Sequence, residues 1–181
     1  MVSSCFSHQS FKSLRMIRKI LFACHGNICR SPMAEFVMKD LVEKAGLVNE
    51  FCIESAATST EEIGNPVYPP ARMKLAEHGI GCKGKTARQM TANDYRRFDL
   101  LIGMDSYNIH NMERIAGGDP YGKIHLLMDF TPRPDDVADP WYTRDFEATW
   151  QDVLLGCTCL LQQLVHGEKR RTNGRDEESE G

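Results

Sequence analysis

Apolar residues recur along the chain with two spacings, and the spacing predicts which segments form strands and which form helices. Short apolar runs bounded by polar or turn-forming residues predict strands over residues 17–23, 51–53, 98–104 and 124–128. Apolar positions at helical spacing predict helices over residues 31–45, 70–77, 105–115 and 146–165. The Pro- and Asp-rich stretch 131–140 is predicted to be a loop.

This alternation of strands and helices predicts an α/β fold. The expected architecture is a three-layer sandwich, in which a four-stranded parallel sheet carries helices on both faces. Sites in such sheets lie beyond the carboxyl ends of the strands. Cys24 directly follows the apolar run of the first predicted strand, so the search for chemistry begins there.

Length and composition narrow the class of protein. With 181 residues, 41% hydrophobic and 26% charged, the chain fits one globular domain. A net charge of −3 gives no reason to expect a nucleic-acid partner. No apolar run reaches the roughly 18 to 20 residues of a membrane span, so no membrane partner is expected. Seven cysteines without a framework spacing predict a reduced, cytoplasmic setting.

The two ends of the chain differ in composition from the rest. Residues 1–15 are Ser-rich and basic, and we interpret them as a disordered or non-native extension before Met16, with a transit peptide as the weaker alternative. Residues 167–181 are charged and contain no large apolar side chain, so disorder is predicted there. The predicted domain is therefore 16–166.

Residues 24–31, CHGNICRS, place a cysteine where a buried strand ends and an arginine where a helix begins. A loop that closes onto a helix N-terminus aims backbone N–H groups inward, where they and the helix dipole stabilise negative charge. Cys24 would be held there as the reactive thiolate. Arg30 offers a planar fork for two phosphoryl oxygens, and Ser31 can donate a hydrogen bond to the sulfur. The predicted oxyanion cradle consists of His25, Gly26, Asn27, Ile28, Cys29 and Arg30.

Two other motifs compete with this loop. Cys82 and Arg88 repeat the C-x5-R spacing, but that pair follows a predicted helix rather than a strand. Residues 79–86, GIGCKGKT, match the Walker A pattern, yet the helix formers before Gly79 stand where that motif needs a strand. We therefore interpret this stretch as a helix end followed by a basic surface loop.

A third loop carries Asp135, Asp136 and Asp139, followed by Pro140, Trp141 and Tyr142. An acidic turn is the simplest interpretation of such a run. The aromatic pair beside a carboxylate on a rigid backbone favours a recognition surface instead. Of the three carboxylates, Asp139 is favoured as an acid because Pro140 fixes the chain beside it.

The stretch FACHGNICRSPMAE, with DPW far downstream, resembles the low-molecular-weight protein tyrosine phosphatases. SAATST, HGI, TARQMT, FDLLIGMD and FEATW follow in family order, so the resemblance runs from about residue 17 to about residue 165. It implies hydrolysis of phosphotyrosine and small aryl phosphates through a phosphocysteine intermediate, without metal or cofactor. A cognate tyrosine kinase is a possible partner in such families.

The resemblance also implies residue roles. Cys24 matches the nucleophile, Arg30 the phosphate-binding arginine and Asp139 the general acid and base. Asn27, Ser31 and Ser55 match the hydrogen bonds that support the loop. Cys29 matches a second cysteine that, in the family, pairs reversibly with the nucleophile. Trp141 and Tyr142 match one wall of the substrate slot.

The chain departs from the family in two places, and three rival functions stay open. Glu61 and Glu62 stand where many members carry an aromatic residue in the slot, and a histidine of the family is replaced within CKGKT. An arsenate reductase on this scaffold would need resolving cysteines, but none lies between Cys82 and Cys157. Protein-arginine phosphatases carry threonine where Ile28 stands. A non-catalytic phosphopeptide-binding module would be expected to lack the nucleophile or the acid.

Overall fold

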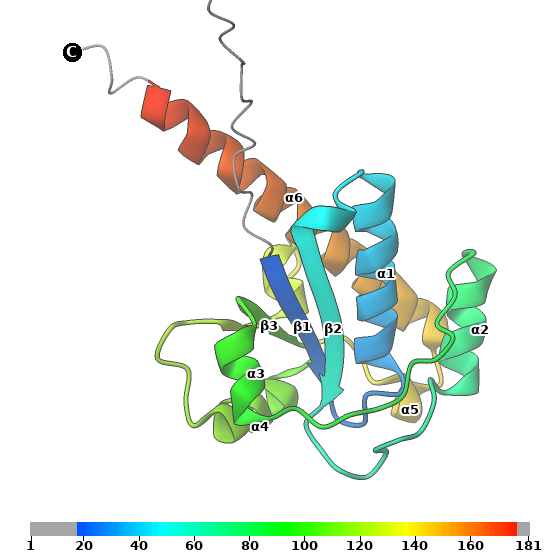
Figure 1. Cartoon of the computed structure of the whole chain (residues 1–181). Helices are drawn as coiled ribbons and strands as arrows, with labels where there is room; N and C mark the ends of the chain where they lie inside the picture. The colour runs from blue at the N-terminus through cyan, green and yellow to red at the C-terminus, as the bar shows by residue number, and fades with distance from the viewer. Residues whose placement is uncertain (1–17, 177–181) are drawn as a thin grey trace, which may run out of the picture.

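A computed structural model describes residues 18–176. Its four strands, β1 (Arg18–Cys24), β2 (Phe51–Ala57), β3 (Leu100–Gly103) and β4 (Ile124–Leu126), form one parallel sheet in the order β2-β1-β3-β4. The helices lie on both faces, which confirms the predicted fold class (Figure 1). Residues 1–15 lie outside the described part of the chain.

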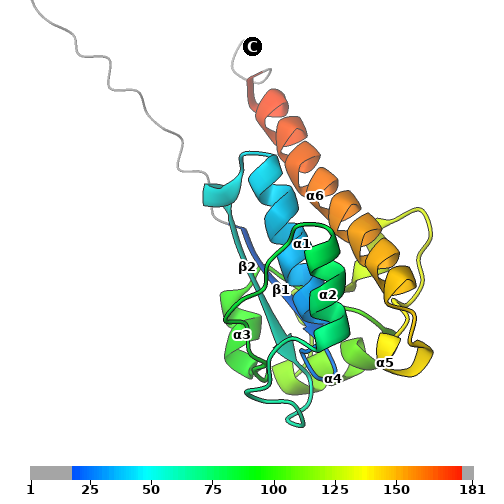
Figure 2. The ribbon, with the colours of Figure 1, turned by 90° about the vertical axis from the view of Figure 1, so that its right-hand side faces the viewer.

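One face of the sheet is covered by α1 (Arg30–Lys44), α2 (Pro69–Glu77) and α6 (Phe146–Asp176), which contact one another (Figure 2). The other face carries α3 (Ala92–Arg97) and α4 (Ser106–Ala116). Short elements complete the fold: η1 (Val48–Glu50), η2 (Leu127–Phe130) and α5 (Pro140–Thr143).

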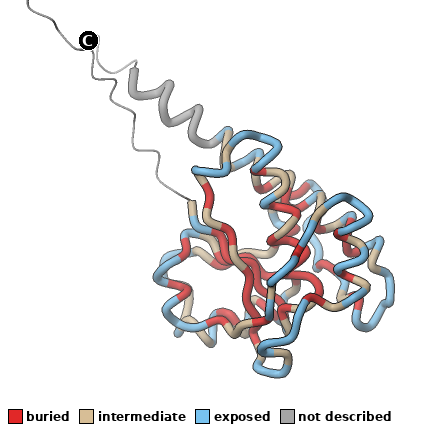
Figure 3. Tube along the Cα trace, turned by 45° about the vertical axis from the view of Figure 1, so that its right-hand side comes forward, coloured by how far each residue is buried: buried red, intermediate tan, exposed pale blue. Residues whose placement is uncertain are grey.

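The central strand β1 decides where the nucleophile candidate points. Successive side chains of a strand face opposite sides of the sheet. Ile20 and Phe22 lie in the core beneath α1 and α6, whereas Leu21 and Ala23 lie in the core beneath α3 and α4. All four are fully buried, and the middle of the tube in Figure 3 is coloured as buried. Cys24 lies two residues after Phe22, so its side chain faces the same side of the sheet as Ile20 and Phe22, which is the side covered by α1.

Several element boundaries differ from those predicted. β2 extends to Ala57 rather than ending at Ile53, because Ser55–Ala57 pair with Phe22–Cys24 of β1 although their side chains are small. Helices α3 and α5 were not predicted. Thr91 and Asp94 form a capping box at the start of α3, a signal that the sequence does carry.

The C-terminal helix also differs from the prediction. α6 was expected to end at Val165, with residues 167–181 disordered, but its backbone continues as helix to Asp176. Residues 177–181 lie outside the described part of the chain. No helix within residues 18–176 is both long and apolar enough to cross a membrane.

Candidate active site

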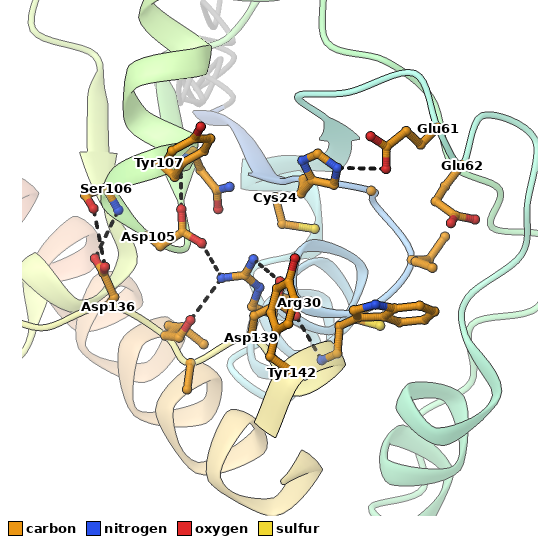
Figure 4. A pocket seen from close by; sticks show the side chains of 18 residues that line it. Cys24, Arg30, Glu61, Glu62, Asp105, Ser106, Tyr107, Asp136, Asp139 and Tyr142 are labelled. Carbon is orange, nitrogen blue, oxygen red and sulfur yellow. Dashed lines mark hydrogen bonds and ion pairs between the residues drawn. The ribbon is translucent and has the colours of Figure 1, made fainter. Parts of the chain in front are cut away.

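A cleft of about 720 Å³ opens at the carboxyl ends of β1 and β3 (Figure 4). Three segments that are distant in sequence line it: the loop from Cys24 to Arg30, the first turn of α4, and the segment from Asp136 to Tyr142. Glu61 and Glu62 border it on the side opposite Ser106 and Asp136. The structure therefore brings the predicted phosphate loop, the predicted acid and the predicted slot residues to one place.

The loop is held open as a cradle by hydrogen bonds on its outer side. The carbonyl oxygens of Cys24 and His25 accept from the N–H groups of Thr58 and Ser59, at 2.9 and 3.0 Å. That of Ile28 accepts from Tyr68 at 2.8 Å. A trans peptide unit carries its C=O and N–H in opposite directions, so the N–H groups that follow these carbonyls face the inside of the loop. Inward N–H groups at a helix start are the arrangement on which the predicted anion cradle depends.

Asn27 sets the sharp turn of this loop. Its φ of 57° is in the left-handed region, which Asn tolerates better than most residues. Its Nδ2 donates to Ser31 Oγ and to Ser55 Oγ, each at 2.8 Å, and its Oδ1 accepts from the backbone N–H of Arg88 at 3.2 Å. The predicted support residues Asn27, Ser31 and Ser55 are thus in direct contact, and all three are buried.

A buried carboxylate fixes the direction of these hydrogen bonds. Glu35 accepts from Ser55 Oγ at 2.5 Å, so the hydroxyl hydrogen of Ser55 is directed away from Asn27. Asn27 Nδ2 supplies the hydrogen in its bond to Ser31 Oγ. The hydrogen of Ser31 is therefore available to Cys24 Sγ at 3.1 Å or, at the longer distance of 3.5 Å, to the carbonyl of Ala56. The chain of bonds favours Ser31 as a donor to the sulfur.

Lys85 completes this support and was not identified from the sequence. Its Nζ lies 3.2 Å from Glu35 Oε2 and donates to the carbonyl of Ser55 at 3.0 Å. Lys39, one helical turn after Glu35, binds the other carboxylate oxygen at 2.5 Å. Lys85 belongs to the GIGCKGKT stretch that we interpreted as a surface loop, and its side chain is in fact largely buried. The only signal of this support in the sequence is that Glu35 lies on a predicted helix with Lys39 four residues later.

Arg30 lies at the centre of the cleft, 3% exposed, and three acceptors hold its guanidinium. It donates to Asp105 Oδ2 at 2.5 Å, to the carbonyl of Val137 at 3.0 Å and to Asp139 Oδ2 at 2.7 Å. Burial alone would lower the pKa of Arg30, but the charges of Cys24, Asp139 and Asp105 outweigh it and raise the pKa above its ordinary value. Arg30 is therefore a permanent cation in the cleft that Cys24 also lines. Asp105 is also the N-cap of α4.

The three carboxylates of the acidic loop have different partners. Asp135 accepts from the N–H of Asp136 within the loop, at 2.8 Å. Asp136 accepts from Ser106 at the start of α4. Asp139 caps α5 by accepting from the N–H of Trp141 at 3.0 Å, and its other oxygen binds Arg30. Of these three, Asp139 is the one whose carboxylate reaches the arginine of the cradle.

The predicted slot residues form the mouth of the cleft. Tyr142 is 83% exposed and Trp141 44% exposed; the Trp141 ring packs against Tyr68 with ring centroids 5.4 Å apart. Glu61 Oε2 lies 3.0 Å from His25 Nε2. Tyr107, in the first turn of α4, adds a third exposed aromatic ring that sequence reasoning missed. The aromatic rings at the mouth suit contact with a flat, uncharged ring of a bound molecule, and the carboxylates suit positive charge in the chain that carries this ring.

The second loop cysteine, Cys29, is a thiol that resists ionisation. Cys29 is buried at the N-cap of α1. Burial raises its pKa to about 12, and the neighbouring charges of Cys24 and Asp139 act in the same direction. Cys29 is therefore a neutral thiol near pH 7. No group of three or more His, Cys, Asp or Glu side chains suited to a metal ion occurs in the part of the chain that the structure describes.

Comparison with known proteins agrees with this geometry. The family model described as low molecular weight phosphotyrosine protein phosphatase matches residues 19–170. A low molecular weight protein-tyrosine-phosphatase of Bacillus subtilis, YfkJ, is 40% identical over 147 residues, which cover 80% of this chain and 94% of that protein. Its crystal structure superposes with a TM-score of 0.81 over 83% of this chain and 96% of that chain, at 38% identity.

Two further solved structures are similar. A low molecular weight protein tyrosine phosphatase from Streptococcus pyogenes is 42% identical, with a TM-score of 0.74 over 82% of this chain and 93% of that one. A structure described as Drosophila arginine phosphatase is 29% identical, with a TM-score of 0.74 over 81% of this chain and 97% of that one. The fold and the site define a cysteine-containing α/β phosphatase.

The chain belongs to the low molecular weight phosphotyrosine protein phosphatase family. It is a phosphoric monoester hydrolase of the protein-tyrosine-phosphatase class.

Proposed function

We propose that this enzyme hydrolyses phosphotyrosine and small aryl phosphates through a phosphocysteine intermediate on Cys24, with Asp139 as general acid and then general base. The observation that supports this most is the position of three groups in one cleft. Cys24, Arg30 and Asp139 all line the cleft; Cys24 Sγ lies 3.1 Å from Ser31 Oγ, and Arg30 donates to Asp139 at 2.7 Å. When substrate binds, two phosphate oxygens replace the carboxylate of Asp139 as hydrogen-bond acceptors of the Arg30 guanidinium.

In the first step the thiolate of Cys24 attacks phosphorus, and the bond from phosphorus to the phenolic oxygen breaks. The electron pair of that bond stays on the oxygen, which takes the proton of Asp139. Arg30 and the inward N–H groups of the loop stabilise the charge on the three equatorial oxygens. The phenol leaves, and the phosphoryl group remains on the sulfur.

In the second step a water molecule attacks the same phosphorus. Asp139, now ionised, accepts a proton from that water, and the bond from sulfur to phosphorus breaks. The sulfur leaves as a thiolate, which the hydroxyl hydrogen of Ser31 stabilises at 3.1 Å. Inorganic phosphate then dissociates, and Arg30 regains Asp139. A kinase that phosphorylates the substrate is the reciprocal partner we propose, in a cytoplasmic setting.

The aromatic mouth supports an aryl ester as the substrate. Only Pro140 separates Asp139 from Trp141 and Tyr142, and the aspartate and both aromatic residues line the cleft, so a substrate ring held against the aromatic pair has its ester oxygen near the carboxylate. An arsenate reductase would need resolving cysteines downstream of the loop, and neither Cys82 nor Cys157 lines the cleft; both are buried. Arginine phosphatase activity is the second candidate, because one similar structure is so described. Ile28, where such enzymes carry threonine, argues against it.

One experiment separates these functions. A single preparation is assayed with phosphotyrosine, phosphoarginine, arsenate plus a thiol reductant, and ATP. We expect turnover of phosphotyrosine at least about 100-fold above the other three, because a fixed site that fails to match the substrate loses transition-state interactions of this size. A kcat/KM for phosphoarginine equal to or above that for phosphotyrosine would replace the proposal with the second candidate. Arsenate reduction above phosphotyrosine hydrolysis would point to the reductase.

A further inference from the structure

The segment that carries Asp139 is attached to the rest of the cleft at successive residues. The N–H of Val137 donates to the carbonyl of Met104, at the end of β3, at 2.8 Å, and the Val137 side chain is fully buried. The Ala138 carbonyl accepts from Thr149 Oγ1 of α6 at 3.2 Å. These contacts fix the height of the segment above the sheet.

A third attachment is made by a carboxylate in the cleft wall. Asp136 Oδ1 accepts from the N–H of Ser106 at 3.0 Å, and its Oδ2 accepts from Ser106 Oγ at 3.4 Å (Figure 4). Ser106 is the first residue of α4, where an N–H group has no partner within the helix and where negative charge is favourable. Asp136 thus joins the acid segment to the helix whose N-cap, Asp105, also binds Arg30.

We propose that Asp136 is a positioning residue for the general acid: its bond to Ser106 fixes the segment so that Asp139 meets the leaving oxygen. The proposal rests on the function proposed above. Asp139 lies three residues further along, and it must leave Arg30 when phosphate binds yet stay over the ester oxygen. Two of its neighbours, Val137 and Ala138, are held by the sheet and α6, and Asp136 supplies the attachment on the α4 side.

The chain offers matched variants for a test. Asp136→Ala removes the acceptor. Ser106→Pro removes both donors, and proline is well tolerated at the first helical position, after a residue in extended conformation such as Asp105. Asp135→Ala is the control, because Asp135 accepts only from its neighbour in the same loop among the bonds described above. Thermal melting and competitive inhibition by inorganic phosphate check that each variant keeps its fold and its cradle.

The readout is kcat/KM for phenyl phosphate and for an aryl phosphate whose leaving group is far more acidic. Asp136→Ala and Ser106→Pro should each lower the value for phenyl phosphate by about tenfold, since a misplacement of about 1 Å can cost up to about 10² in rate. The acidic leaving group needs less protonation, so its loss should be clearly smaller. The double variant should lose no more than either single variant, and Asp136→Asn, whose amide oxygen still accepts from Ser106, should recover most of the rate. Asp135→Ala should stay within about twofold.

Several results would overturn the positioning role. Equal losses on both esters would show that the acid is not involved. A loss in Asp136→Ala without one in Ser106→Pro, or no recovery in Asp136→Asn, would assign the effect to the charge of Asp136 rather than to its bond. If Asp139→Asn discriminates between the esters while Asp136→Ala does not, the positioning role alone is lost. If Asp139→Asn does not discriminate, the proposed acid itself is wrong, and the role of Asp136 falls with it.

Discussion

The chain contains two C-x5-R segments, and the structure puts them to different uses. Cys24 ends a central strand and Arg30 begins a helix, so the residues between them close into a cradle. Cys82 and Arg88 follow α2 in a segment whose Gln89 forms an isolated parallel bridge to Ala57. The two segments share a spacing and differ in the elements that flank it.

The two arginines resemble each other in charge but not in surroundings. Arg88 binds Asp94 at 3.0 Å and Glu54 at 2.9 Å, and these partners raise its pKa against the opposing effect of burial, as happens for Arg30. Arg88 lies outside the cleft, and its backbone supports the first segment. Its N–H donates to Asn27 Oδ1, and its carbonyl accepts from Ala57. An arginine between two carboxylates therefore becomes a candidate phosphate ligand only where a cradle of N–H groups opens beneath it.

The largest contrast is expected between the two cysteines. Cys24→Ser should lower kcat/KM by more than about 10⁴-fold, as the removal of a nucleophile does in other enzymes, while phosphate still binds. Cys82 is buried and lines no part of the cleft, and its pKa is raised by that burial, so Cys82→Ser should keep its activity within about threefold. Activity of the Cys24→Ser enzyme within tenfold of the wild type would remove Cys24 from the nucleophile role.

The next largest contrast is expected between substitutions of the two arginines. Arg30→Gln should lose about 10² to 10³ in kcat/KM, because it removes the charge that meets the transferring phosphoryl group. Arg88→Gln keeps its backbone bonds and should mainly lower the free energy of unfolding, by about 1–2 kcal/mol for a partly exposed ion-pair cluster. Steady-state kinetics and urea unfolding of both variants measure the contrast. A similar kinetic loss in both would show that the Arg88 cluster acts on the chemistry.

The third contrast is between Asp139, which binds Arg30, and Asp94, which binds Arg88. Asp139→Asn should lose on the order of 10² in kcat/KM for phenyl phosphate, less for an acidic leaving group, and should flatten the alkaline limb of the pH profile. A larger defect in Asp136→Asn would move the acid to Asp136.

Asp94 should affect stability instead. Burial acts to raise its pKa, but hydrogen bonds from Arg88 and Thr91 outweigh burial and lower it. A pKa lowered by folding contributes stability above the unfolded value of about 3.9, and this contribution is lost as the pH falls through the lowered pKa. Asp94→Asn should therefore unfold more easily at pH 7 and show a weaker acid dependence below about pH 4. Unfolding curves that shift in parallel at all pH values would contradict this.

Sequence reasoning found those parts of the molecule that depend on short-range pattern. The strand end at Cys24, the helix start at Arg30 and the Asp139-Pro140 turn are each encoded within a few residues. The buried support of the cradle is not, because Glu35 and Lys85 meet only through the fold. The bond between Arg30 and Asp105 is not encoded locally either, because it depends on how β3 lies beside β1.

The missed secondary structure has a similar physical origin. The end of β2 carries Ser55, Ala56 and Ala57, whose small side chains show no apolar alternation, yet they pair with β1 and pack under the cradle. Helix α5 is a single turn after the N-cap Asp139, too short for any periodicity. In both cases the residues that build the site lack the apolar spacing by which a strand or a helix is recognised in a sequence.

A smaller contrast is expected on oxidation. Mild peroxide should inactivate the enzyme reversibly through a Cys24–Cys29 disulfide, since a thiolate oxidises to a sulfenic acid that a neighbouring thiol can attack. Because the pKa of Cys29 is about 12, its thiolate fraction rises with pH, and disulfide closure should quicken between pH 7 and pH 9. Cys29→Ser should lower the activity recovered with dithiothreitol severalfold, whereas Cys82→Ser should not. Peptide mapping that finds Cys29 free and Cys24 over-oxidised would contradict the pairing.

The smallest effect concerns the mouth of the cleft. Glu61 and Glu62 should disfavour acidic phosphopeptides, and exchanging both for glutamine should narrow the ratio of kcat/KM between basic and acidic peptides by about threefold, which is typical of exposed charges. The change should shrink at high salt. An unchanged ratio would place these two residues outside the region that substrates contact.

The most direct test of the central claim is to trap the intermediate. The enzyme is mixed with an aryl phosphate of acidic leaving group, so that the second step limits the rate, quenched in acid within the first turnover, and mapped by mass spectrometry. One phosphoryl group should be found on the Cys24 peptide of the wild type and of Cys82→Ser, and none on that of Cys24→Ser. A burst of released leaving group with the phosphoryl label on another residue, or on none, would contradict the assignment of Cys24 as the phosphorylated nucleophile.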